Sequence, residues 1–272
     1  MSEPGAGGGT RGSGGEYYLD PGLYDIVYSD FVADVAPHLA LMRGAGGPAI
    51  EVCCGNGRLL LPALEAGVAC DGLDWSLDML ASLREKLAAR KLSTNVIHAD
   101  MRDFSLPNRY ALIVIPFNSF LHNLTQADQL STLRCCRHHL LSGGRLVLTL
   151  FHPSVEKLMQ WNGVEQFLKE VPFGRGSVKV WDRADDDRVE QIRNMTRRIE
   201  FLDAQGQVTR RESVTFSLRY IYKPEMELLL HVAGFSRWEA RPLFADYRTA
   251  ESATGDRPIR EGDNVQWTAW KD

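Results

Sequence analysis

An acidic residue and two glycines stand close together in EVCCGNGR, residues 51–58 of this 272-residue chain. Glu51 closes an apolar run, and Gly55 and Gly57 come just before the apolar stretch LLLPALEAG. Backbone amides of a glycine loop that opens a helix can hold a carboxylate or a ribose, because they point at the ligand and the helix dipole favours negative charge. The stretch therefore predicts a binding site for a small molecule.

The same loop does not fit the sites that bind a pyrophosphate. The dinucleotide fingerprint G-x-G-x-x-G needs a third glycine where this chain has Leu60, and a Walker loop needs Gly-Lys-Ser/Thr. These differences disfavour a nicotinamide oxidoreductase. Cys53 and Cys54 are interpreted as small residues packed beneath the turn, not as a redox pair.

Two further acids close the strands expected after the loop. Asp74 ends ACDGLDW, where a carboxylate suits the paired donors of a ribose. Trp75 and Met79 lie beside it and suit the faces of an adenine. Asp100 ends NVIHAD, where it suits the exocyclic amine of that base. Together these residues describe an adenosine ligand without a pyrophosphate.

The elements that must position these residues alternate between strands and helices. Strands are expected at 48–54, 69–75, 95–100, 110–118 and 144–151, with helices between them, the last over 128–144 and ending in two glycines. Such alternation predicts a doubly wound parallel sheet, whose ligands bind at the carboxyl ends of the strands.

The flanking segments follow other patterns. Residues 1–16 are Gly-rich and are expected to be a disordered tail, followed by a helix that carries Tyr24 and Tyr28 and breaks at Pro37. After Pro153 we expect a helix over 154–170 and then three antiparallel stretches. Residues 224–272 are expected to return to the core with a helix and two strands.

In this order and spacing, the motifs resemble those of class I S-adenosylmethionine-dependent methyltransferases. That family's first motif is acid-x-Gly-x-Gly-x-Gly, matched here except that Cys53 replaces the first glycine. The resemblance covers about residues 45–153 and the final helix. The matching stretches are EVCCGNG, GLDWSLDML, HADMRDF, LIVIPFNSFLHN, LLSGGRLVLTLF and ELLLHVAGF.

The resemblance implies a Rossmann-like α/β fold with seven strands, the last antiparallel, and an antiparallel β insertion forming a lid. It divides the chain into a cofactor-binding core (17–153), a substrate lid (154–223) and a return to the core (224–272). S-adenosylmethionine is the implied cofactor. The residues expected to bind it are Tyr28, Glu51, Cys53, Gly55, Asn56, Gly57, Asp74, Trp75, Met79, Asp100, Met101, Pro116 and Asn118.

The implied reaction moves a methyl group to a nitrogen or oxygen of a small metabolite. The donor is already activated, so the protein mainly aligns the acceptor, and a base is needed only when the acceptor arrives protonated. The candidates for catalysis are His122, His152 and Tyr24, and an imidazole of near-neutral pKa would suit proton removal. The expected substrate contacts are Tyr24, Asn118, His122, Arg219, Tyr220, Arg241 and Tyr247. Structural alternatives remain: loop histidines, core aromatics and solvated strand faces.

Other partners are disfavoured. CCRHH suggests a metal site, but Cys136 shares an inward helix face with Leu133 and Leu140, so no metal is expected. The net charge of −4 and a lid of mixed charge argue against nucleic acid. No apolar run reaches the roughly 18 residues of a membrane span, and no secretory signal precedes the five cysteines, so reduced thiols in a cytoplasm are expected. A homodimer, and a module that binds the cofactor without catalysis, stay open.

Overall fold

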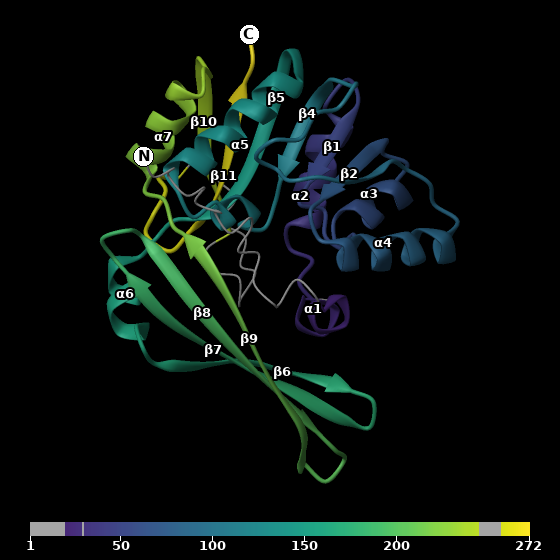
Figure 1. Cartoon of the computed structure of the whole chain (residues 1–272), viewed down its shortest axis with the longest axis vertical. Coiled ribbons are helices and arrows are strands. Elements are labelled where there is room, and N and C mark those ends of the chain that lie inside the picture. The colour runs from purple at the N-terminus through teal and green to yellow at the C-terminus, as the bar shows by residue number, and fades with distance from the viewer. Residues whose placement is uncertain (1–19, 29, 245–256) are drawn as a thin grey trace, which may run out of the picture.

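The computed structural model describes residues 20–28, 30–244 and 257–272, which form a seven-stranded sheet and a separate four-stranded sheet (Figure 1). The larger sheet has the order β10-β11-β5-β4-β1-β2-β3. Its neighbours pair in parallel except around β11, which is antiparallel to both β5 and β10. The expected α/β fold with one antiparallel strand is confirmed. The strands are β1 (Ala49–Val52), β2 (Cys70–Asp74), β3 (Val96–His98), β4 (Tyr110–Ile115), β5 (Leu140–Phe151), β10 (Arg237–Phe244) and β11 (Asn264–Trp270).

Two apolar clusters cover the two faces of this sheet. One joins the sheet to α5 and α7, and the other joins it to α2, α3 and α4. The central strand β4 is apolar because side chains on both of its faces are buried, as in other parallel sheets. The helices are α2 (Val35–Arg43), α3 (Leu60–Glu65), α4 (Leu77–Arg90), α5 (Gln126–His139) and α7 (Lys223–Val232).

Side-chain caps start two helices at the carboxyl edge of the sheet. Ser76 Oγ accepts a 3.3 Å hydrogen bond from the amide of Met79 and so caps the N-terminus of α4. Thr125 Oγ1 does the same for α5, accepting from the amide of Asp128 at 3.1 Å. The two caps fix the residues at which α4 and α5 begin. They therefore also fix the length of the loops that follow β2 and β4.

Two expected boundaries are wrong. Pro37 does not end a helix: α1 (Pro21–Tyr28) stops earlier, and Pro37 lies in the first turn of α2, where a missing N–H removes no helical hydrogen bond. Helix α5 stops at His139 and does not run into the glycines, because Leu140 already pairs with Tyr110 as the start of β5.

The lid holds four strands, not three. The helix expected over 154–170 is α6 (Val155–Trp161) only, and the chain turns at Gly163, whose φ is 71°. The next segment pairs with β7 as an additional edge strand, β6. The apolar residues of β6 fall at spacings that a helix also allows, which explains the error. The strands of the lid are β6 (Glu165–Phe173), β7 (Gly176–Asp187), β8 (Ile192–Leu202) and β9 (Val208–Arg219).

Helix α1 joins the lid to the core. Leu23 and Val27 are buried in the apolar cluster of the lid sheet, and the helix also contacts α4 of the core (Figure 1). Across the described residues, no helix has the length and apolar character needed to cross a membrane.

Candidate active site

A pocket lies where the carboxyl ends of β1, β2 and β4 meet; we call it the strand-end pocket. Its walls come from the glycine loop, the end of β2, the loop after β3 and the turn after β4. Most of the residues expected to bind the cofactor therefore gather in one place. The predicted residues that line it are Tyr24, Glu51, Cys53, Gly55, Asp74, Trp75, Met79, Asp100, Met101, Pro116 and His122.

The glycine loop owes its shape to backbone conformations that favour glycine. Gly55 has φ 53° and Gly57 has φ 94°. A Cβ added to Gly57 would lie 2.6 Å from Leu83 Cδ1, so this glycine also allows the loop to pack closely against α4. Gly57 therefore shapes the pocket without lining it.

Cys53 stands where the resembled motif has glycine, and its backbone adopts a conformation that favours glycine. Its φ is 64°, in the left-handed region, and its Sγ lies 3.6 Å from Met101 Sδ. Burial raises the pKa of the Cys53 thiol well above its usual range, so the thiol stays protonated. The cysteine side chain makes a packing contact toward the loop after β3.

Glu51 carries an unsatisfied carboxylate oxygen into the pocket. The residue is 2% exposed, and its Oε2 has no hydrogen-bond partner in the described part of the chain. Burial raises the pKa of Glu51 well above its usual range, an effect that nearby Arg58 opposes. A buried polar atom without a partner is costly, so this oxygen fits a ligand that donates hydrogen bonds, such as an ammonium group.

Arg58 was not among the expected site residues, yet it lines the same pocket. Its Nη1 and Nη2 each donate 2.7 Å hydrogen bonds to the buried carboxylate of Asp34. Its guanidinium also stacks on the ring of Phe117, with Cζ 4.4 Å from the ring centroid. Its position directly after Gly57, in the turn before α3, was the sequence signal, because the glycine loop lines the pocket.

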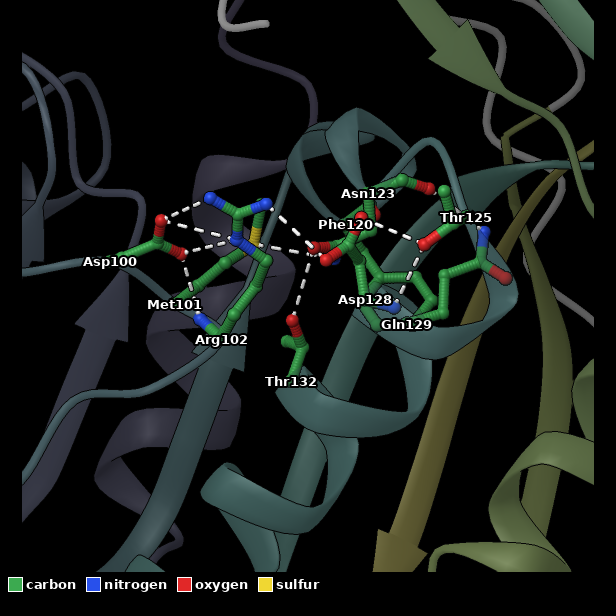
Figure 2. Close-up of polar contacts among 9 residues, drawn as sticks. All are labelled: Asp100, Met101, Arg102, Phe120, Asn123, Thr125, Asp128, Gln129 and Thr132. Atoms are coloured by element: carbon green, nitrogen blue, oxygen red, sulfur yellow. Dashed lines mark hydrogen bonds and ion pairs between the residues drawn. The ribbon is translucent and has the colours of Figure 1, made fainter. Parts of the chain in front are cut away.

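Polar contacts tie the far wall of the pocket to α5, as Figure 2 shows. Arg102 Nη2 donates to Asp100 Oδ2 at 2.6 Å, and Arg102 Nη1 donates to Asp128 Oδ1 at 3.3 Å. Asn123 Nδ2 donates to Met101 Sδ at 3.5 Å and to the carbonyl of Phe120 at 3.0 Å. Arg102 and Asn123 line the pocket and were missed, because only this fold brings the two loops together.

A second cavity of about 430 Å³ lies between the sheet edge and the lid; we call it the lid pocket. Of the expected site residues, Tyr28, Asn118, His122 and His152 line it. One wall is a buried ion pair: Arg197 Nε donates to Asp182 Oδ1 at 2.7 Å, and Arg197 Nη1 donates to the Tyr28 hydroxyl at 2.9 Å. The aromatic residues of its wall are Tyr28, Phe31, Phe117, Phe151, Trp161 and Phe216.

The two pockets meet at the turn after β4. Among the described residues, Phe117 and His122 line both of them. Burial lowers the pKa of His122 to about 4, below the near-neutral value that would suit proton removal. His122 is a neutral imidazole at physiological pH. The neutral ring can accept a hydrogen bond where the two pockets meet, but its low pKa makes it a weak base.

Two tyrosines each lie in the pocket that was expected for the other. Tyr24 was expected at the substrate and lines the strand-end pocket, whereas Tyr28 was expected at the cofactor and lines the lid pocket. His152 lies in the lid pocket, away from the strand-end pocket. Asn56 lines neither pocket: its Nδ2 donates to Asp25 Oδ1 at 2.9 Å, which attaches the glycine loop to α1.

Three expected substrate contacts lie elsewhere. Arg219 of β9 is buried and pairs with Glu225 of α7 at 2.8 Å. This ion pair fastens the lid to the core. Tyr220 is buried and lines neither pocket. Arg241 lies on β10 and pairs with Glu239 at 2.8 Å. The fourth, Tyr247, lies outside the described residues.

Comparisons with known proteins agree with this geometry. Residues 49–144 match a family model described as a methyltransferase domain. Over 133 residues the chain is 32% identical to dTDP-3-amino-3,6-dideoxy-alpha-D-glucopyranose N,N-dimethyltransferase of Streptomyces fradiae; the alignment covers 46% of this chain and 51% of that protein. The chain spans about half the length of the curated relatives it matches.

Solved structures share the whole architecture. A S-adenosylmethionine-dependent methyltransferase from Clostridium acetobutylicum superimposes with a TM-score of 0.71 at 14% identity, over 92% of this chain and 96% of that chain. CalS10, an amino pentose methyltransferase from Micromonospora echinaspora, does so with a TM-score of 0.70 at 20% identity, over 92% and 98% of the two chains. Residues 49–144 therefore match a methyltransferase domain, and the chain has the fold of class I S-adenosylmethionine-dependent methyltransferases.

Proposed function

We propose that the protein transfers a methyl group from S-adenosylmethionine to an amine nitrogen of a small molecule of the amino-sugar class. The observation that carries this proposal is the meeting of two pockets at Phe117 and His122. One pocket has the residues that suit a nucleoside donor, and the other has room for an acceptor beneath the lid. The relatives that act on amino sugars support the class of acceptor.

The strand-end pocket fits the donor at both of its ends. Glu51 offers its unpartnered Oε2 to the amino group of the methionine part. Asp74 lines the pocket at the end of β2, where it can accept from the ribose hydroxyls, and Met101 lies on the side assigned to the adenine. When bound, the sulfonium supplies an activated methyl group, so the protein's main tasks are alignment and exclusion of water.

In the lid pocket, His122 orients the acceptor. A neutral imidazole can accept a hydrogen bond from an amine N–H, which leaves the nitrogen lone pair for the methyl group. The low pKa of His122 means that it does not hold the proton of an ammonium substrate. The acceptor therefore enters as the neutral amine, which a desolvated pocket favours over the charged form.

Methyl transfer to defined amines tests this function. The purified protein is incubated with S-adenosylmethionine and either dTDP-3-amino-3,6-dideoxy-α-D-glucopyranose or free 3-amino-3-deoxyglucose, and the products are weighed by mass spectrometry. We expect a methylated amine that depends on the protein and is lost in Glu51→Gln. Methylation confined to hydroxyl groups would exclude the amine, and a protein that does not bind S-adenosylhomocysteine would overturn the donor assignment.

A further inference from the structure

We propose that Phe117 is a positioning residue: its ring is the partition between the donor and acceptor pockets and holds the acceptor in line with the methyl group. The inference rests on the proposed function for the identity of the two pockets. Phe117 follows β4 by two residues, and its side chain lines both pockets. The acceptor and the donor must therefore approach each other past this ring.

The backbone under the ring is strained. Phe117 has φ 57° and Asn118 has φ 64°, two consecutive non-glycine residues in the left-handed region. Such conformations persist only where the surroundings impose them, and they cluster at functional sites. Here two hydrogen bonds of Asn118 to β5 hold the left-handed backbone in place. The amide of Asn118 donates to the carbonyl of Thr149 at 2.9 Å, and its Oδ1 accepts from the amide of Phe151 at 2.7 Å.

The ring is clamped from both pockets. On the donor side, Arg58 stacks on it at 4.4 Å. On the lid side, Tyr28 packs edge-on with ring centroids 4.9 Å apart, and Phe31 packs at 5.0 Å. A clamped aromatic ring at this junction has little freedom to swing aside.

The clamping residues are themselves fixed. Arg58 is held by the buried carboxylate of Asp34. Tyr28 accepts from Arg197, which pairs with Asp182 of the lid sheet. The orientation of Phe117 thus depends on both the glycine-loop side and the lid. Because a misplacement of about 1 Å can cost 100-fold in rate, loss of the ring should reduce alignment more than it reduces binding.

Three variants of Phe117 separate the effect of the ring from that of the backbone strain. Phe117→Leu trims the ring, Phe117→Ala removes it but keeps the strain, and Phe117→Gly removes both. Phe104→Leu is the matched control, because Phe104 is buried in the core and lines neither pocket. The measurements are kcat and KM on an amine that the wild type methylates, the affinity for S-adenosylhomocysteine and the melting temperature.

We expect kcat to fall on the order of 10- to 100-fold in all three Phe117 variants, with KM and donor affinity within about threefold of wild type. Phe117→Gly should melt above Phe117→Ala, because glycine tolerates the left-handed backbone. Phe104→Leu should lower the melting temperature and leave kcat unchanged. If Phe117→Gly recovers both the kcat and the melting temperature of the wild type, then only the backbone strain mattered and the proposal is overturned. A wild-type kcat in Phe117→Leu would overturn it as well.

A structure of Phe117→Gly with S-adenosylhomocysteine tests the partition without any acceptor. We expect the two pockets to merge into one continuous cavity, and a wall that persists would overturn the proposal. A wild-type protein that methylates no amine would instead refute the proposed function, so the two failures are distinguishable.

Discussion

The backbone amide of Gly55 donates a 2.8 Å hydrogen bond to Oδ2 of Asp74, which joins the glycine loop after β1 to the end of β2. The other oxygen, Oδ1, accepts from the amide of Ser76 at 2.9 Å. The carboxylate is therefore fixed in the pocket wall before any ligand arrives. A carboxylate oxygen has more than one acceptor site, so each can still accept from a ribose hydroxyl.

Replacement of Asp74 should weaken donor binding. Asp74→Ala removes both acceptor oxygens and leaves the amide of Gly55 unpaired, so the affinity for S-adenosylhomocysteine should fall about 10- to 100-fold, the equivalent of one or two lost charge-assisted hydrogen bonds. Isothermal titration measures this change. Asp78→Asn is the control, because it removes an exposed charge four residues away; equal losses in both variants would refute the ribose assignment.

Glu51→Gln should stabilise the free protein at high pH. The folded-state pKa of Glu51 lies above the unfolded value of about 4.3. Folding therefore takes up a proton between the two values, and the free energy of unfolding falls as pH rises through that interval. Arg58 opposes the shift, while Asp34 and Asp74 reinforce it. The variant should match the stability of wild type near pH 4 and be more stable than wild type at pH 8.

Denaturant titrations at the two pH values measure this difference. The same substitution should weaken binding of S-adenosylhomocysteine and remove the rise of affinity with pH that the ionisation of Glu51 produces. A variant that is less stable than wild type at pH 8 would mean that the Glu51 carboxylate is satisfied in the free protein.

Cys53→Gly should preserve donor binding, because the backbone at this position already has the left-handed φ of 64° that glycine prefers. Cys53→Ala keeps the strained backbone and loses the contact between Sγ and Met101 Sδ. We expect Cys53→Ala to be less stable than Cys53→Gly by about 0.5–1 kcal/mol. Thermal unfolding ranks the pair. Because both variants lack the sulfur, the opposite order would show that the left-handed backbone of residue 53 is not strained by a side chain.

His122→Asn should lower kcat about tenfold without changing the shape of the pH–rate profile between pH 5.5 and 8. A group with a pKa of about 4 is already neutral throughout this range. The profile should instead follow ionisation of the acceptor amine. If the acidic limb of the profile disappears in this variant, then His122 titrates as a catalytic base and the hydrogen-bond role assigned to it is wrong.

Local patterns were sufficient to predict the sheet and most of the residues that line the strand-end pocket. Glu51, Asp74 and Asp100 each lie at or just beyond the carboxyl end of a strand, and these strand ends meet at one edge of a parallel sheet. Asn56 shows the limit of that reasoning, because a loop residue between two pocket residues can point to a neighbouring helix, here toward Asp25 of α1.

The acceptor side was harder to predict because the lid brings distant segments together. Arg219 and Tyr28 both lie where the lid meets the core. Arg219 fastens the lid through its ion pair with Glu225, whereas Tyr28 lines the lid pocket. The pKa of His122 also depends on burial beneath β9, since its ring lies 6.4 Å from that of Phe216. Residue types and spacing carry no direct signal of such burial.

A crystal structure with S-adenosylhomocysteine locates the donor in one measurement. We expect the adenine beside Met101, the ribose at Asp74, the amino group at Glu51 and the sulfur at the junction formed by Phe117 and His122, facing the lid pocket. A nucleoside bound in the lid pocket, or a sulfur directed away from that junction, would contradict the assignment of the two pockets to donor and acceptor.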